Sequence, residues 1–307
     1  MVKKDRSVNV NKTYLMQMLP LFYQTHLKSQ LSLTEYLLLK ILLNVLQVIK
    51  NVSLEKLATA LPLPIVFVSR RKKLQRFLSI KSFNIQRIWF PIIHTWLETY
   101  FTTDQVIYLV IDRTSWGCIN LLMISVVWDK RAFPVYFELL PKLGKYKVLN
   151  KQRTVNIDNP CCITDPPTHG SLFISDDLLN SNFSEQQVAF TKVLPIFTKY
   201  KTVVLGDREF CSVRLANWLR EKGLYFCLRL KKNEFVQVET EIWYHLNDLG
   251  LSPGVSFFLQ GVKVTKIKGF LGFNLACKWK RKYLGWKPEE GWFILTNLPS
   301  LDVAIIA

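Results

Sequence analysis

Two aspartates, Asp112 and Asp207, have side chains and positions suited to binding a divalent metal ion. Asp112 follows the apolar run Val106–Ile111, and Asp207 follows a second apolar run, Thr202–Leu205, after one glycine. Carboxylates at the carboxyl ends of neighbouring strands can share divalent metal, because Mg²⁺ prefers hard oxygen ligands. A pair of such ions polarises a phosphodiester and activates the attacking water or hydroxyl. The alternative is that an aspartate at a strand end simply begins a turn.

Two further acidic residues lie in the same part of the sequence. Glu209 would point to the opposite face if the strand before it continued, so we interpret it as structural. Glu138 lies inside a predicted strand, and we interpret it as a hydrogen-bonded polar residue. Neither is predicted to be a metal ligand.

The elements around the two aspartates alternate between strands and helices. Apolar, β-rich runs predict strands, and helical spacing with start and stop signals predicts helices. In chain order, the predictions are strands at Val106–Ile111, Ile119–Trp128 and Ala132–Leu140, a helix from Ser184 to about Tyr200, a strand at Thr202–Leu205, a helix at Val213–Lys222 and a strand at Tyr225–Leu230. This order is that of a ribonuclease-H-like core, and the predicted fold class is therefore mixed α/β.

The first hundred residues are predicted to be mostly helical and to bind DNA. Here 15 basic minus 4 acidic residues gives +11, which is more than half of the net charge of +18. Two short helices, a turn and a basic helix suit a DNA-binding module, in which the basic side chains contact phosphates. The alternative is a solvated basic helix. The predicted phosphate contacts are Arg70, Arg71, Lys72, Lys73 and Arg76.

Composition indicates a polyanionic partner, either nucleic acid or an acidic membrane surface, and argues against a membrane-spanning helix. A pI near 9.7 is typical of proteins with a polyanionic partner. The most apolar segment, Leu31–Lys50, contains Glu35 and Lys40, which argues against a membrane-spanning helix. The first residues lack the apolar core of a signal peptide, so we expect a cytoplasmic protein with reduced cysteines.

Several strings in the sequence resemble the DDE transposases of bacterial insertion sequences, and most closely the insertion-sequence-four family. The two aspartate motifs of that family are similar to Ile111–Thr114 and Val204–Phe210. Its N-terminal module is similar to Ser53–Ala58 and Arg76–Leu78, and the strand that closes its β-rich insertion domain is similar to Trp292–Leu298.

The resemblance implies a function and a set of partners. Its first two acidic ligands map to Asp112 and Asp207, with two Mg²⁺ ions expected and Mn²⁺ able to substitute. It implies metal-dependent cleavage and strand transfer at terminal inverted repeats. Double-stranded DNA, both the repeats and the target, is the implied partner, bound by a homodimer. In some relatives a tryptophan at the Trp292 position stacks on a flipped base, and ordinary core packing is the alternative for Trp292.

Two departures from the family pattern lead to further expectations. The third acidic residue of the family belongs to a Tyr–Arg–Glu–Lys signature on a helix after the Trp292 strand. That ligand is expected to be absent from this chain, which would be truncated at the C-terminus and inactive. The stretch over residues 145–178 is longer than the family's usual link.

The sequence thus predicts four segments and two candidate functions. The segments are a helical DNA-binding domain (1–100), the first part of the catalytic core (101–232, with an irregular insert at about 145–182), a β-rich insertion domain (233–298) and the beginning of a truncated C-terminal helix of the core (299–307). The first candidate function is that of an insertion-sequence transposase. The alternative is a non-catalytic DNA-binding protein that competes with or inhibits a full-length transposase.

Overall fold

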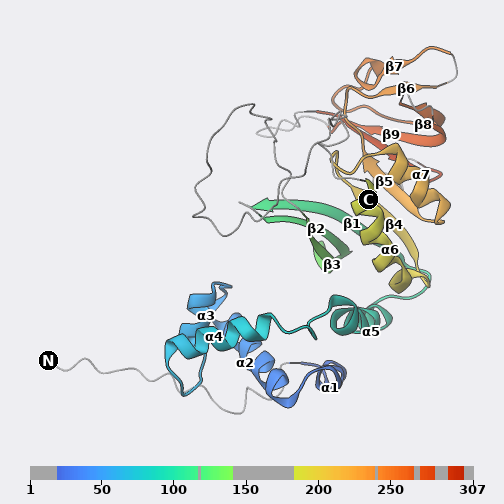
Figure 1. Ribbon diagram of the computed structural model, residues 1–307. Helices are drawn as coiled ribbons and strands as arrows, with labels where there is room; N and C mark the ends of the chain where they lie inside the picture. The colour runs from blue at the N-terminus through green and yellow to red at the C-terminus, as the bar shows by residue number, and fades with distance from the viewer. Residues whose placement is uncertain are drawn as a thin grey trace, which may run out of the picture. The chain divides into compact units, whose positions relative to one another are not determined.

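The computed structural model describes residues 19–116, 119–140, 183–238, 241–265, 270–280 and 290–300 (Figure 1). The chain divides into two compact units, residues 1–100 and 101–307. The predicted irregular stretch at about 145–182 and the predicted helix beginning at Leu301 lie outside the described residues.

The described part of the first unit is helical. Its helices are α1 (Leu21–Gln30), α2 (Leu33–Ile49), α3 (Leu54–Ala60), α4 (Phe67–Leu78) and α5 (Phe90–Tyr100), with a π-helical turn at Ile85–Trp89. Leucines and other apolar residues of α2, α3 and α4 pack into one cluster, and residues of α1, α2 and α5 into a second. Helical spacing of these apolar side chains explains why the segments pack together as helices.

A capping box lies at the start of α2. Ser32 and Glu35 form a capping box, in which the backbone N–H of Ser32 donates to Glu35 Oε2 at 2.9 Å. This bond lowers the pKa of Glu35. Glu35 therefore begins the helix by satisfying an N–H group that has no helical partner.

No single helix in the described part of the chain has the length and apolar character needed to span a membrane. By length and composition alone, α2 and α3 together would pass that test, and they are bent by 105° with respect to each other.

The second unit is built on one large mixed sheet, which confirms the predicted fold class. In the described residues the strand order is β3-β2-β1-β4-β5-β10-β9-β8-β6-β7. The first five strands in this order are β3 (Arg131–Leu140), β2 (Ile119–Trp128), β1 (Val106–Trp116), β4 (Lys201–Gly206) and β5 (Tyr225–Arg229). β1 is antiparallel to β2 and parallel to β4, and β4 is parallel to β5. This is the arrangement of a ribonuclease-H-like core.

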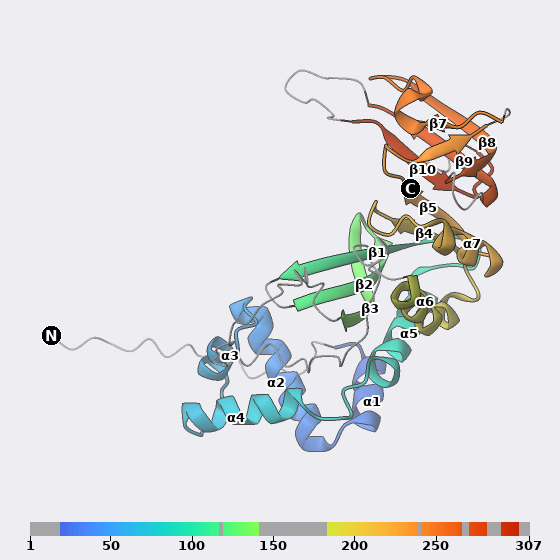
Figure 2. The same ribbon diagram turned by 45° about the horizontal axis from the view of Figure 1, so that its top comes forward.

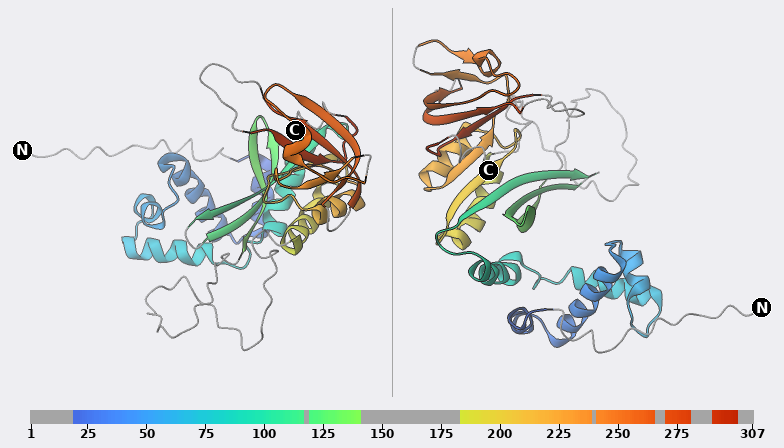
Figure 3. Two further views of the ribbon diagram at one scale, coloured as in Figure 1. Left: turned by 90° about the horizontal axis from the view of Figure 1, so that it is seen from above. Right: turned by 180° about the vertical axis from the view of Figure 1, so that it is seen from behind.

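The same sheet continues into the later strands (Figures 2 and 3). These are β6 (Phe235–Gln237), β7 (Tyr244–His245), β8 (Ser256–Val264), β9 (Phe270–Lys278) and β10 (Trp292–Thr296). β10 pairs with both β5 and β9 in antiparallel fashion. β10, the last strand in the described residues, therefore joins the core strands to the earlier β-rich segment.

β1 is longer than the sequence predicted. β1 does not end before Asp112 but continues to Trp116, because its pairing with β2 extends from Leu109↔Val126 to Trp116↔Ile119. The β2–β3 turn is formed by Asp129 and Lys130, both with positive φ, as in the turns that match the twist of a hairpin.

Two helices cover one face of β4 and β5 (Figures 1 and 3). They are α6 (Phe183–Val193) and α7 (Val213–Glu221), and Phe190 of α6 packs against Trp218 of α7. α6 ends earlier than the predicted Tyr200, and a 3₁₀ turn over Leu194–Phe197 follows. Pro195 explains the change, since it cannot continue the hydrogen bonding of an α-helix.

Polar side chains at the end of β10 hold it against β5. Thr296, fully buried, donates its hydroxyl to the carbonyl oxygen of Phe226 at 2.6 Å. The Asn297 side chain accepts from the backbone N–H of Phe226 at 3.0 Å and donates to the carbonyl oxygen of Leu224 at 2.8 Å. These bonds continue the ladder between the two strands beyond its last backbone pair.

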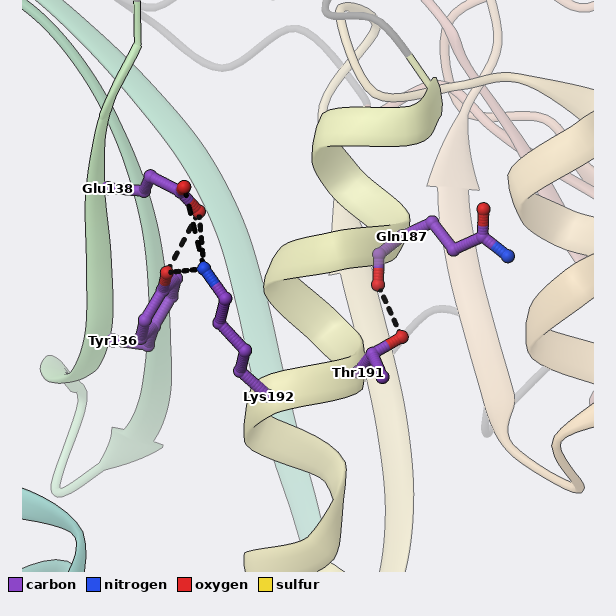
Figure 4. A network of polar contacts seen from close by, with 5 residues as sticks. All are labelled: Tyr136, Glu138, Gln187, Thr191 and Lys192. Carbon is purple, nitrogen blue, oxygen red and sulfur yellow. Dashed lines mark hydrogen bonds and ion pairs between the residues drawn. The ribbon is translucent and has the colours of Figure 1, made fainter. Parts of the chain in front are cut away.

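A lysine links α6 to the edge strand β3 (Figure 4). Lys192 Nζ lies 2.8 Å from the hydroxyl of Tyr136 and 3.3 Å from Glu138 Oε2, and the Tyr136 hydroxyl donates to the same carboxylate at 2.8 Å. The expectation that Glu138 is a hydrogen-bonded polar residue is confirmed.

We expect Lys192→Met to lower the free energy of unfolding by about 1 kcal/mol, because the ion pair is one-third exposed and partly screened.

Urea unfolding would measure this effect, and a double-mutant cycle with Tyr136→Phe would isolate the contribution of the shared hydrogen bond. A Lys192→Met protein as stable as the wild type would show that water replaces the ammonium group without cost.

Candidate metal centre

The sheet register brings Asp112 and Asp207 to the same level on neighbouring strands. The parallel pairing of β1 with β4 ends at Ile111↔Gly206. Asp112 is the next residue on β1, and Asp207 is the next residue after β4. Both aspartates are exposed, although Ile111 before Asp112 is buried. Asp207 thus lies at the carboxyl end of β4, as predicted, whereas the prediction that Asp112 ends its strand was wrong: Asp112 lies inside β1, where the pairing with β4 stops and the pairing with β2 continues.

Gly206 lets β4 approach its neighbours closely just before Asp207. A Cβ atom at this position would lie 2.8 Å from Leu228 Cδ2 and 3.2 Å from Phe210 Cβ, and both of these residues are buried. We therefore expect Gly206→Ala to destabilise the fold by about 1–3 kcal/mol, the usual cost of overpacking a core. Urea unfolding would measure it, and an unchanged midpoint would mean that Leu228 and Phe210 can move aside.

Each aspartate is oriented by the backbone that follows it. Asp112 Oδ1 accepts from the N–H of Arg113 at 2.8 Å, and Asp207 Oδ1 accepts from the N–H of Arg208. The turn after Asp207 is closed by a bond from the N–H of Phe210 to the carbonyl oxygen of Asp207 at 2.9 Å. Short-range bonds of this kind are typical of aspartates that begin turns, so they are compatible with both interpretations of Asp207.

A buried arginine follows Asp112. The side chain of Arg113 is only 3% exposed. Its Nε lies 2.9 Å from Glu209 Oε1, and its Nη2 lies 3.5 Å from Glu185 Oε2 at the start of α6. Burial raises the pKa of Glu209, Arg113 lowers it, and the charges of Asp112 and Asp207 raise it further. Glu209 is thus close enough to both aspartates to sense their charge.

A second group of charged residues lies beside Asp207. Glu290, just before β10, forms ion pairs with Arg208 and Arg229, the latter at 2.8 Å. Arg229 Nη1 lies 3.9 Å from Asp207 Oδ1, and its guanidinium lies over the ring of Trp292, 4.6 Å from the centroid. Burial and Arg208 lower the pKa of Arg229, and Asp207 opposes them. Trp292 is 52% exposed, so it is not an ordinary core residue.

The balance of charges around the aspartates suits a cation. Four carboxylates form ion pairs with three guanidinium groups, and a fifth carboxylate, that of Asp112, acts on Glu209 through its charge, so the group holds five acidic and three arginine side chains. The carboxylates are those of Asp112, Glu185, Asp207, Glu209 and Glu290, and the guanidinium groups are those of Arg113, Arg208 and Arg229. The exposed aspartate oxygens are also the hard donors that Mg²⁺ prefers. In the described ranges, no three histidine, cysteine or acidic residues are grouped to hold a metal ion.

Two buried cysteines of the described residues, Cys227 and Cys277, are poor candidates for this chemistry. Burial raises the pKa of Cys227 to about 11 and that of Cys277 to about 12. Both thiols are therefore protonated at neutral pH and cannot act as thiolate nucleophiles.

The predicted phosphate contacts lie on α4 in the first unit. Leu74 and Phe77 face the helical cluster, and Lys72 and Arg76 are exposed. Arg70 instead donates to the carbonyl oxygen of Leu61 at 2.9 Å. Arg71 forms an ion pair with Glu55 at 3.2 Å, and Lys73 is partly buried. The helix therefore presents part of the predicted basic surface and uses Arg70 and Arg71 to contact α3 and the residue that caps it.

Sequence reasoning missed the arginines and Glu290. Arg113 and Arg208 each directly follow one of the two aspartates in the sequence, which was the available signal, whereas Arg229 at the end of β5 has no aspartate beside it. Glu290 comes close to Arg229 only because β10 pairs with β5, a contact that spacing alone cannot reveal.

Comparison with protein families gives a match over about a third of the chain, within the second unit. Residues 168–274 match the family described as the transposase DDE domain. The matched segment includes Asp207 and ends before Trp292. This match supports the prediction of a DDE transposase.

Among solved structures, the chain is similar to piggyBac transposase in a synaptic complex with hairpin DNA. The sequence identity is 15%, the TM-score is 0.37, and the similarity covers 85% of this chain and 50% of that one. The chain thus spans half the length of that transposase. No curated protein matches the chain.

Proposed function

We propose that this chain is the transposase of a bacterial insertion sequence of the insertion-sequence-four family, and that Asp112 and Asp207 bind its catalytic metal. The observation that carries the proposal is the register of β1 and β4, which places both carboxylates at one level. Mg²⁺, or Mn²⁺ in its place, would be held by the two aspartates. When bound, such ions polarise a phosphodiester and lower the pKa of an attacking water.

The residues of the chain have distinct roles in this proposal. Asp112 and Asp207 bind the metal and thereby fix where the scissile phosphate lies. Arg229 holds the ring of Trp292 from one side, and the exposed remainder of the ring is available to stack on an unpaired base. The exposed Lys72 and Arg76 on α4 contact DNA phosphates.

The proposed DNA partners are the terminal inverted repeats of the element and a target duplex, bound by a homodimer. The net charge of +18 favours such a polyanion. Each phosphate neutralised by a basic side chain adds about 0.9 to the slope of log affinity against log salt. Binding should therefore weaken steeply as salt rises.

Cleavage is proposed to need a third carboxylate in addition to Asp112 and Asp207. The family resemblance assigns it to a helix after β10, in the Tyr–Arg–Glu–Lys signature. Chains with and without that helix are therefore compared in the experiment below.

A second candidate function is that of a DNA-binding protein without cleavage activity. The observation that favours it is the pair of exposed basic side chains on α4, Lys72 and Arg76, which can contact phosphates without a metal ion. Such a protein would occupy the ends of the element and compete with an active transposase.

The test is to measure binding and cleavage separately on duplexes that carry the ends of the element. Binding is measured in EDTA, and cleavage in Mg²⁺ or Mn²⁺. The 307-residue chain is compared with a version extended by the family's C-terminal helix. Metal-dependent cleavage by the extended version supports the transposase. Binding by both versions without cleavage by either supports the DNA-binding protein, and an absence of binding contradicts both.

A further inference from the structure

Arg113 connects three segments that meet at the aspartate pair. It follows Asp112 on β1, and its two partners come from elsewhere: Glu209 from the turn after β4, and Glu185 from the first turn of α6. A guanidinium keeps its charge, so burial at 3% exposure is costly unless carboxylates compensate for it. The buried cation therefore favours an arrangement in which both glutamates stay close to β1.

The backbone pairing between β1 and β4 stops just before the turn that carries Asp207. Its last residue on β4 is Gly206, one residue before Asp207. Beyond that point the turn is closed by its own bonds, from the N–H of Phe210 to Asp207 and from the N–H of Ser212 to Phe210. The contact between Arg113 and Glu209 thus bridges β1 and the turn just past the end of the ladder.

We propose that Arg113 is a positioning residue, which fixes the separation of Asp112 and Asp207 by holding Glu209 and Glu185 against β1. The inference rests on the proposed metal-binding function of the two aspartates. Arg113 has no contact with the metal in this role, and it acts through the turn that carries Asp207. The two contacts are ion pairs without hydrogen-bond geometry, made by two different nitrogens of the guanidinium, Nε toward Glu209 and Nη2 toward Glu185. A lysine ammonium carries the same charge at a single point.

Electrostatics and positioning predict opposite effects on metal affinity. Loss of Arg113 removes a positive charge close to the proposed cation site, which by Coulomb attraction alone would strengthen metal binding. Loss of a positioning residue should weaken metal binding by about 10–100-fold, the usual effect of removing a group that orients metal ligands. The sign of the change therefore separates the two roles.

The experiment is a titration of the 307-residue chain with Mn²⁺, monitored by electron paramagnetic resonance. Arg113→Met and Arg113→Lys are compared with the wild type and with Arg131→Met. Arg131 is exposed at the start of β3 and pairs with Trp128 of β2. Trp128 lies five residues along β2 from Met123, the residue that pairs with Asp112. We expect Mn²⁺ binding to be at least about tenfold weaker in both Arg113 variants and unchanged in Arg131→Met.

Equal or tighter Mn²⁺ binding by a folded Arg113→Met protein overturns the proposal. If that variant does not fold, Arg113→Lys decides the question, because it retains the charge and places it on a single nitrogen; unchanged affinity then overturns the proposal. If the wild type binds no Mn²⁺, the proposed metal function fails on its own. Positioning is then tested by hydrogen exchange at the Phe210 amide, which should become about tenfold faster in Arg113→Lys and stay unchanged in Arg131→Met. An unchanged exchange rate at the Phe210 amide in Arg113→Lys overturns the positioning role of Arg113.

Discussion

Asp207→Asn, made in the version extended by the C-terminal helix, is expected to slow metal-dependent DNA cleavage by roughly a thousandfold. Asparagine keeps the shape of the side chain and its bond to the N–H of Arg208, but it removes the negative charge. A metal that loses a charged ligand loses several kcal/mol of transition-state stabilisation, and about 1.4 kcal/mol corresponds to a tenfold change in rate. Asp112→Asn should act in the same way, because its carboxylate lies at the same level of the sheet.

The measurement is a single-turnover cleavage rate on a duplex that carries an element end. Asp248→Asn is the matched control, since Asp248 is an exposed acidic residue in the 3₁₀ turn over Leu246–Leu249. DNA affinity in EDTA should be similar in all three variants, because neither site aspartate is proposed to contact DNA directly. Cleavage by Asp207→Asn at the wild-type rate would remove Asp207 from the proposed centre and favour its interpretation as a turn residue.

Phe226→Ala is expected to lower the free energy of unfolding by about 4 kcal/mol. Phe226 lies on β5, is fully buried, and packs edge-to-face on Phe273 of β9 at a centroid distance of 5.8 Å. Truncation would leave a cavity between the core strands and the later strands, and buried phenylalanine-to-alanine changes cost about 3–5 kcal/mol. This is a large fraction of the 5–15 kcal/mol that stabilises a typical domain.

Urea unfolding followed by tryptophan fluorescence would measure the loss, with Phe226→Leu as a smaller deletion at the same place. Because the sheet is continuous from β3 to β7, we expect one transition for the whole second unit. Two separate transitions, only one of them shifted by Phe226→Ala, would instead show that the strands after β5 unfold as an independent domain.

The core strands and helices were predicted well because apolar runs and helix-capping residues are visible within a short stretch of sequence. Apolar runs followed by aspartate located β1 and β4, and Gly223 correctly marked the end of α7. The strand order also follows from known rules, since a hairpin and two right-handed crossovers leave few alternatives. The end of β1 was wrong because pairing with β2, and not the apolar run, determines how far that strand extends.

The charged network around the aspartates could not be predicted, because each contact depends on packing between distant segments. Arg113 meets Glu185 only when α6 lies over the sheet, and Arg229 meets Glu290 only when β10 pairs with β5. The position of Trp292 was predicted, but not the arginine that covers one side of its ring. Sequence thus indicated the acidic residues of the candidate site, and tertiary contacts supplied the basic ones.

The pairing of β10 with β5 has a consequence for how the protein is made. The hydroxyl of Thr296 and the carbonyl oxygen of Phe226 that accepts its hydrogen bond are 70 residues apart in the sequence. At about 5–20 residues per second, a ribosome needs roughly 3–14 s to synthesise that interval. During this time one edge of β5 is without its final partner, and unpaired strand edges promote association between chains. Slower elongation across this interval should therefore lower the yield of soluble protein, and faster elongation should raise it.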